Sequence, residues 1–250
     1  QPENNITGPE IVNIADYLTI NSQKNPEKPA LLYPERITYR DLEEKVNMFS
    51  SGVSASGIKP GMKTLVMVPA GIDFFTLIFA LLSLGAVPVM IDPGMGVKAM
   101  TRILSSLQPD AFIGTPKAYL LRLVKPHIFS TARLMVVTAD YGFGKVSGLR
   151  KILKLKAGNY IRHKSESGEL AAIFYTSGST GTAKGVCYTT GMLKNQIEIT
   201  RKQFNIGPEE IDLCTFPLLG LFAICHGNSS VIADMDMVHP AKMNPARVIK

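Results

Sequence analysis

Cysteine is scarce in this chain of 250 residues, and the cysteines present are poorly placed for disulfides or a metal. Only three occur, Cys187, Cys214 and Cys225, and no two of them form a CxxC pair. An odd number of widely spaced cysteines argues against a disulfide framework and for a reduced, cytoplasmic setting. We therefore expect each cysteine to be a small buried apolar residue rather than a ligand or a nucleophile.

Long hydrophobic runs are also lacking, except at residues 72–91. Residues 72–91 carry a single charge, on Asp73, and are long enough to cross a bilayer. Gly85 and Pro88 interrupt this run where a globular protein would turn. The run is therefore predicted to be an apolar helix, residues 73–84, followed by a strand, residues 87–91. No signal peptide is recognisable, and the first residue is Gln1, so we expect part of a longer protein.

Acidic residues are missing between Asp140 and Glu166, where seven Lys and Arg lie within residues 145–164. The chain has 27 basic and 20 acidic residues, so without these seven the remainder is neutral, at 20 of each. Zinc-finger, RNP and basic-zipper patterns are absent, so nucleic-acid binding is not predicted. Apolar residues alternate with the basic ones, and the segment is either a solvated helix, which we favour, or a peripheral contact to the inner face of an anionic membrane.

Two kinds of apolar segment alternate along the chain. Short runs rich in β-branched residues predict strands, and apolar positions three or four apart predict helices. Thr38 is placed to cap the second helix, with Asp41 in its first turn. The order predicts an α/β fold with largely parallel sheets covered by helices on both faces. The predicted strands are residues 64–68, 87–91, 111–113, 134–138, 170–175 and 185–188, and the predicted helices are residues 11–18, 42–53, 73–84, 97–107, 118–124 and 192–204.

A polar segment, Tyr175–Gly185, lies between the last two predicted strands. Its glycines let the backbone approach a ligand closely, and its successive backbone N–H groups can form an anion-binding nest. Lys184 adds a cation, so the ligand that suits the segment is a polyphosphate. The glycines are Gly178, Gly181 and Gly185, and hydroxyl groups come from Thr176, Ser177, Ser179, Thr180 and Thr182.

The position of Lys184 separates this segment from a Walker A loop. In that loop the lysine directly follows the second glycine and precedes Ser or Thr, whereas here Thr182 and Ala183 separate Gly181 from Lys184. A kinase or P-loop ATPase is therefore disfavoured. A flexible linker is disfavoured too, because a linker needs no lysine and seldom lies between two apolar strands.

The same segment resembles the signature of the AMP-forming adenylating superfamily, which includes acyl-CoA synthetases, peptide-synthetase adenylation domains and luciferases. Residues 176–185 match every fixed position of that signature. Residues 37–42 look like the family's early Thr-Tyr element, and residues 81–93 look like its Gly-Ala and Asp-Pro element. Residues 87–96 and 231–236 are similar to the β-lactone synthetase branch of long-chain olefin biosynthesis.

The resemblance implies that a carboxylate attacks the α-phosphate of ATP, which gives an acyl-adenylate and pyrophosphate. Lys184 would then be the catalytic residue, because it would help to neutralise the charge that grows on the phosphates. Mg²⁺ is implied with ATP, and coenzyme A in branches where a thiol accepts the acyl group. In the β-lactone branch the 3-hydroxyl of the substrate displaces AMP instead. The implied ATP-binding residues are Thr176, Ser177, Gly178, Ser179, Thr180, Gly181 and Lys184.

An apolar segment further along the chain takes the place of a family segment that lines the acyl site. The expected substrate-binding residues are Phe216, Leu219 and Phe222, with ordinary core as an equal alternative. Such a lining would suit a fatty or 3-hydroxy fatty acid. His226 could neighbour that site, although a structural histidine is the simpler interpretation.

The chain is expected to form the N-terminal portion of an AMP-dependent ligase domain over residues 1–250, with a candidate subdomain joint at residues 165–168. The family's acidic magnesium ligand, ribose-binding aspartate and mobile C-terminal domain come later, so these residues alone are not expected to turn over. Asp234 and Asp236 have DxD spacing without further acidic partners, so no metal ligand is assigned. The alternative function is a non-catalytic nucleotide- or membrane-binding module.

Overall fold

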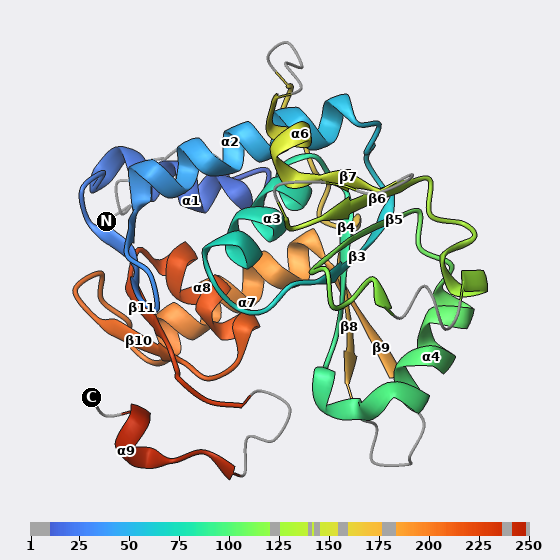
Figure 1. Ribbon diagram of the computed structural model, residues 1–250. Helices are drawn as coiled ribbons and strands as arrows, with labels where there is room; N and C mark the ends of the chain where they lie inside the picture. Colours follow the sequence, from blue (N-terminus) through green and yellow to red (C-terminus); the bar gives the residue numbers. More distant parts are fainter. Residues whose placement is uncertain are drawn as a thin grey trace.

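A computed structural model describes residues 11–120, 126–139, 142, 146–154, 160–176, 184–236 and 242–248. In this part of the chain, two sheets are packed together with helices between and around them (Figure 1). Most neighbouring strands are parallel, which confirms the predicted α/β class.

The larger sheet has seven strands in the order β7-β6-β5-β3-β4-β8-β9. Only the last pair, β8 and β9, is antiparallel. The six strands predicted from the sequence all belong to this sheet, and their bounds agree within one or two residues. The strands are β3 Lys63–Met67, β4 Val87–Ile91, β5 Ala111–Gly114, β6 Leu134–Val137, β7 Ser147–Gly148, β8 Leu170–Thr176 and β9 Lys184–Thr189.

The smaller sheet brings two strands from residues 29–38 together with two strands from residues 211–232. Its order is β10-β11-β1-β2, and only β1 and β2 are antiparallel. Figure 1 shows β1, in blue, next to β11, in red. None of these strands was predicted from the sequence. They are β1 Pro29–Tyr33, β2 Ile37–Thr38, β10 Ile211–Cys214 and β11 Ser229–Ile232.

The helices connect the strands and agree with most of the predicted ranges. Of the predicted helix 118–124, residues 121–124 lie outside the described residues, and residues 116–119 form a turn. The segment that contains Phe222 is helical, which was not predicted. The helices are α1 Ala15–Lys24, α2 Tyr39–Ala55, α3 Ile72–Ser83, α4 Gly96–Leu107, α6 Leu149–Lys154, α7 Thr190–Gln203, α8 Pro217–His226 and α9 Pro245–Val248, with short 3-10 turns η1 Pro93–Met95 and η2 Pro126–Phe129.

The start of α2 shows how the sequence sets a helix boundary. Thr38 is extended, and its hydroxyl accepts a hydrogen bond from the backbone N–H of Asp41 at 3.1 Å. The same hydroxyl donates to the Asp41 carboxylate at 2.7 Å. This satisfies one of the N–H groups that a helix start leaves without a partner, as the sequence predicted.

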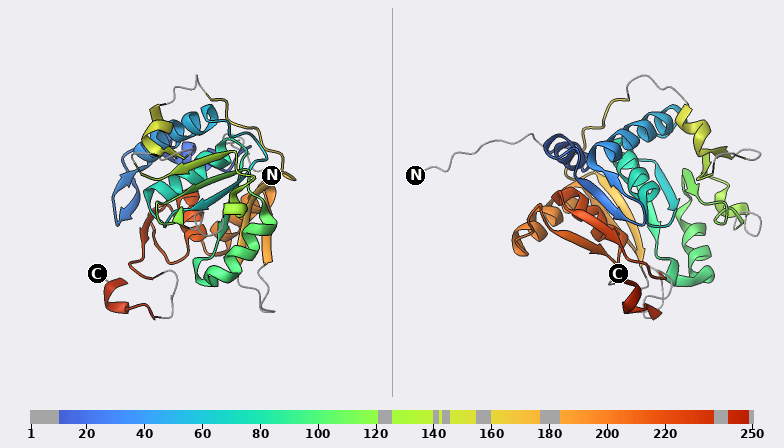
Figure 2. Two further views of the ribbon diagram at one scale, coloured as in Figure 1. Left: turned by 45° about the vertical axis from the view of Figure 1, so that its right-hand side comes forward. Right: turned by 60° about the vertical axis from the view of Figure 1, so that its left-hand side comes forward.

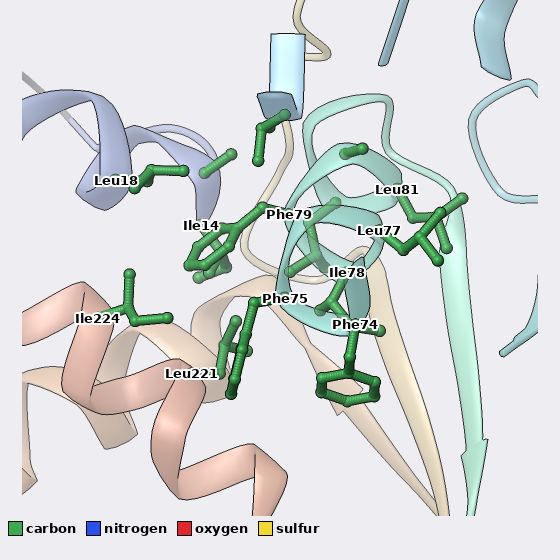
Figure 3. Packing of buried hydrophobic residues seen from close by; sticks show 14 of the residues in the cluster. Ile14, Leu18, Phe74, Phe75, Leu77, Ile78, Phe79, Leu81, Leu221 and Ile224 are labelled. Atoms are coloured by element: carbon green, nitrogen blue, oxygen red, sulfur yellow. The ribbon is translucent and has the colours of Figure 1, made fainter. Parts of the chain in front are cut away.

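Helix α3 lies at the centre of the molecule and contacts elements of both halves. Its side chains are buried almost all round, from Phe74 to Ser83. Figure 3 shows Phe75 and Phe79 between Ile14 and Leu18 of the N-terminal region and Leu221 of α8. The apolar run at residues 72–91 is thus core, and the described residues contain no helix long and apolar enough to span a bilayer.

The seven-stranded sheet has a core on each face. The cluster around α3 lies on one face, and a second cluster that includes Leu104 of α4, Phe112 of β5 and Val89 of β4 lies on the other. Figure 2 shows helices on both sides of these strands. This explains why the strands carry apolar residues on both faces, and it confirms the predicted covering of this sheet.

The cysteines follow the prediction in two cases of three. Cys214 and Cys225 are buried, and burial raises the pKa of both thiols, that of Cys214 to about 11. For Cys187 the prediction is wrong, because it lies on β9, an edge strand with mostly exposed side chains. All three are free thiols.

Candidate phosphate-binding site

The predicted phosphate loop connects the two strands of a β-hairpin. Strands β8 and β9 pair in antiparallel register, with Tyr175 opposite Gly185 and Thr176 opposite Lys184. The rings of Phe174 and Tyr188 meet edge to face, with centroids 5.5 Å apart, and stabilise the pair. The hairpin therefore fixes both ends of the loop, at Thr176 and Lys184.

Strand β4 brings a second loop to the same place. It lies parallel to β8, with Ile91 opposite Tyr175, so the residues that follow both strands emerge at one edge of the sheet. The N–H of Asp92 donates to the carbonyl oxygen of Tyr175 at 3.1 Å. The Asp92 carboxylate in turn accepts a hydrogen bond from the N–H of Gly94 at 2.8 Å. Ligands of open parallel sheets bind outside this carboxyl edge.

Tyr175 and Gly185 form a close contact at the base of the loop. A Cβ added to Gly185 would lie 2.9 Å from Cζ of Tyr175. The tyrosine is half-buried, and this desolvation raises the pKa of its hydroxyl. The ring thus packs across the position where β9 has no side chain, and the glycine is needed for space rather than for a left-handed backbone.

The predicted ATP-binding residues divide into two groups. Thr176 and Lys184 are exposed at the facing ends of β8 and β9, where a ligand could reach both. The others, Ser177, Gly178, Ser179, Thr180 and Gly181, lie outside the described residues. Their role remains a prediction from the sequence.

The predicted acyl-site residues do not share one environment. Phe216 and Leu219, at the start of α8, are 43% and 50% exposed, whereas Phe222 is 6% exposed and belongs to the core around α3. Only Phe216 and Leu219 are therefore accessible to a ligand in this structure. All three assignments stay predictions.

His226 makes the contacts of a structural residue. It is buried near the end of α8, and its Nε2 lies 2.9 Å from the carbonyl oxygen of Ile197 and 3.3 Å from the hydroxyl of Thr200. Burial lowers the pKa of its imidazole. These contacts connect α8 to α7, which supports a structural role for His226.

Within the described residues, no group of three or more His, Cys, Asp or Glu could hold a metal ion. Asp234 and Asp236 do not belong to such a group.

Two described residues of the basic segment, Ile152 and Arg162, contact the rest of the protein. In α6, Ile152 is 1% exposed and packs on α2 at Gly52, where a Cβ would lie 2.3 Å from the carbonyl oxygen of Ile152. Arg162 forms an ion pair with Asp16 at 2.9 Å. Ile152 is therefore not available to a membrane, and membrane contact through residues 145–164 stays a prediction.

Residues 165–168 are connected to the N-terminal region. The N–H of Ser165 donates to the carbonyl oxygen of Val12 at 3.2 Å, and the amide of Asn13 donates to the Ser165 hydroxyl at 3.2 Å. Asn13 also donates to the carbonyl oxygens of Leu82 and His163. The proposed subdomain joint at residues 165–168 stays a prediction.

Comparison with known families identifies the class of protein. Residues 18–249 match the AMP-binding enzyme family. The chain belongs to this family, and the matched range includes the β8–β9 hairpin.

Among individual proteins, the chain is similar to an olefin beta-lactone synthetase from Stenotrophomonas maltophilia. The two are 36% identical over 250 residues, which covers 94% of this chain and 45% of that protein. The chain therefore spans about half the length of this relative.

Solved structures share the fold. A long-chain-fatty-acid CoA ligase, named as putative, from Rhodopseudomonas palustris matches with a TM-score of 0.77 and 18% identity, over 94% of this chain and 58% of that one. An O-succinylbenzoate coenzyme A synthetase from Bacillus subtilis, in complex with ATP and a magnesium ion, matches with a TM-score of 0.68 and 16% identity, over 86% and 56%.

Proposed function

We propose that this chain is the ATP-phosphate-binding half of an enzyme that activates a carboxylic acid as an acyl-adenylate with release of pyrophosphate. One observation carries the proposal. The hairpin β8–β9 holds Thr176 opposite Lys184 at the carboxyl edge of the sheet, at the ends of a loop whose sequence suits a polyphosphate. Membership of the AMP-binding enzyme family supports it.

The chemistry assigned to these residues is electrostatic. When a carboxylate attacks the α-phosphate, negative charge grows on the transferring group and on the departing pyrophosphate. Lys184 supplies a cation, Thr176 a hydroxyl donor, and the loop between them backbone N–H groups. Donors that are held in place before the reaction stabilise this charge without reorganisation. The hairpin and the Asp92–Tyr175 hydrogen bond provide that fixed base.

For the substrate and the second step, we propose a fatty or 3-hydroxy fatty acid that closes to a β-lactone. The similarity to an olefin beta-lactone synthetase favours this outcome over transfer to coenzyme A. The exposed apolar side chains of Phe216 and Leu219 suit an aliphatic chain. In such a step the 3-hydroxyl oxygen attacks the acyl carbonyl carbon and its proton is released to water. The bond between that carbon and the phosphate oxygen breaks, and AMP leaves with its electrons.

Carboxylate-dependent exchange of labelled pyrophosphate into ATP tests the proposal. The chain would be fused to the part of the Stenotrophomonas maltophilia relative that follows the matched stretch, because the relative is about twice as long. We expect exchange with 3-hydroxy fatty acids, a loss of about 100-fold in Lys184→Ala, and no loss in Lys202→Ala, a charge on the exposed surface of α7. Lactone formation without added coenzyme A would support the second step. A folded fusion without exchange, beside an active relative, would contradict the proposal.

A further inference from the structure

A hollow of about 500 Å³ lies between the end of α2 and residues 161–164, which follow α6 in the sequence. Ile58 and Leu84 contribute to its lining and are only 3% and 6% exposed, so its floor is apolar. Lys59 and Lys164 also line the hollow, and both are exposed. The hollow thus has an apolar floor and a cationic rim.

The positive charge of this rim is not neutralised by neighbouring carboxylates. Among the described residues that line the hollow, none is acidic. Lys59 and Lys164 take part in none of the ion pairs that the described residues form. Arg162 differs, because its guanidinium donates to Asp16 and Thr19, at 2.9 Å each. Two ammonium groups are therefore free to bind an anionic partner.

An apolar side chain lies beside these cations and is held in solvent. Ile161 lines the hollow and is 89% exposed, more than any other large apolar residue of the described chain. Its neighbours in the sequence are tied to the end of α3. The hydroxyl of Ser83 donates to that of Tyr160 at 3.1 Å, and the N–H of His163 donates to the carbonyl oxygen of Ser83 at 2.9 Å. The segment therefore presents Ile161 to solvent in a fixed place.

The hollow lies at the opposite edge of the seven-stranded sheet from the phosphate loop. Lys59 comes shortly before β3, whereas the loop directly follows β8. Both strands run parallel to β4, so the start of β3 and the end of β8 mark opposite edges. Figure 1 shows α2 and α6 at the top of the view and the loop end of the β8–β9 hairpin at the bottom. A surface that contacts the hollow therefore leaves the nucleotide-binding edge open.

We propose that the hollow and Ile161 dock this chain on an anionic lipid bilayer. Lipid phosphate groups pair with Lys59 and Lys164, and Ile161 enters the apolar boundary beneath the headgroups. A bilayer fits better than a soluble anion, because only a bilayer also buries the isoleucine. Charge complementarity agrees, since the seven basic residues within 145–164 equal the whole net charge of +7. The benefit rests on the proposed function, because fatty substrates partition into bilayers.

Sedimentation with lipid vesicles tests this assignment. The probes are phosphatidylcholine vesicles with and without phosphatidylglycerol, at millimolar lipid and without ATP. We expect binding to the anionic vesicles only, and loss of this binding at high salt. Each lysine near an anionic surface contributes about fivefold, so Lys59→Gln combined with Lys164→Gln should weaken binding roughly 25-fold. Ile161→Asn should weaken it at least about tenfold through loss of apolar burial.

Matched controls remove the same kinds of group elsewhere. Lys24→Gln combined with Lys202→Gln removes two exposed cations from the last turns of α1 and α7. Ile199→Asn removes an isoleucine that is 61% exposed on α7. Both controls should bind vesicles like the unaltered chain. Each protein is measured as this chain and in the fusion described above, and melting curves identify a misfolded variant.

Three results would overturn the proposal: no binding to anionic vesicles, unchanged binding by the hollow variants, or equal losses in the hollow variants and the controls. Binding of glycerol phosphate or poly-glutamate in solution, without binding to vesicles, would also overturn it and make the hollow a site for a soluble anion or an acidic polypeptide. A fusion that exchanges pyrophosphate but ignores vesicles contradicts the docking alone. One that binds vesicles without exchange contradicts the proposed function alone.

Discussion

Replacement of Gly185 by alanine tests whether the base of the phosphate loop is packed as described. A Cβ at position 185 would lie 2.9 Å from Cζ and 3.0 Å from Cε1 of Tyr175. Carbon atoms at optimal separation are about 3.5–4.0 Å apart, so the ring or the strand must move by roughly half an ångström. Tyr175 is half-buried among core residues, so the ring cannot simply turn into solvent.

The magnitude follows from two opposing effects. Overpacking of this kind costs about 1–3 kcal/mol. Removal of glycine stabilises by about 0.4–1 kcal/mol, because it restricts the unfolded chain. We therefore expect Gly185→Ala to lower the free energy of unfolding by about 1–2 kcal/mol, or the melting temperature by about 2–8 °C for a chain of this size.

Urea unfolding followed by circular dichroism measures this difference. Gly168→Ala is the matched control, since a Cβ there would meet no atom within 4 Å; it should be neutral or slightly stabilising. In a Tyr175→Ala background the cost of Gly185→Ala should vanish, because the contact is gone, so a double-mutant cycle isolates the pair. Equal effects of Gly185→Ala in both backgrounds, or equal stability of the two glycine variants, would refute the packing argument.

Three further predictions concern stability and reactivity. Thr38→Ala should lower the free energy of unfolding by about 1 kcal/mol through loss of the helix cap, and a urea midpoint equal to that of the unaltered chain would contradict this. Burial lowers the pKa of His226 below its ordinary 6.5, so the unfolded chain takes up the proton first as the pH drops. The free energy of unfolding should therefore fall below about pH 6.5. Between pH 7 and pH 5, His226→Gln should lose less of this free energy than the unaltered chain. A thiol reagent should modify Cys187 quickly in the native chain. Cys214 and Cys225 should react only in denaturant, because both are buried and their thiol pKa values are raised. Fast reaction of all three thiols in the native chain would contradict the burial of Cys214 and Cys225.

The larger sheet was predictable because its signals are local. Strand β4 and helix α3 come from one apolar run that Gly85 divides, and length alone separates the helix from the strand. Thr38 and Asp41 likewise specify the start of α2 through a contact three residues apart. Such features depend on neighbours in the sequence, so a sequence pattern contains them.

The smaller sheet was not predictable, because its pairing is remote. Leu31 pairs with Ser230, about two hundred residues away, and β2 has only two residues. Helix α8 is apolar on nearly every side, so it has no helical periodicity, and the sequence suggested an acyl-site lining there. Burial of Phe222 in the core follows from packing against α3, which no local pattern indicates.

The candidate site was predicted in part. The motif identified Thr176 and Lys184, and the two strands that flank the loop were predicted, but their antiparallel pairing was not. The Asp92–Tyr175 hydrogen bond depends on β4 lying next to β8, although β5, β6 and β7 come between them in the sequence. Strand order of this kind is a property of the whole sheet, so the sequence did not reveal that Asp92 adjoins the loop.

Calorimetry of MgATP with this chain tests whether the loop between Thr176 and Lys184 binds nucleotide phosphates. We expect the unaltered chain to bind MgATP or pyrophosphate and Lys202→Ala to bind as tightly. Lys184→Ala should weaken binding at least about tenfold through loss of a charge-assisted contact. Lys184→Ala bound as tightly as the unaltered chain, or an unaltered chain with native unfolding behaviour that binds neither ligand, would contradict it.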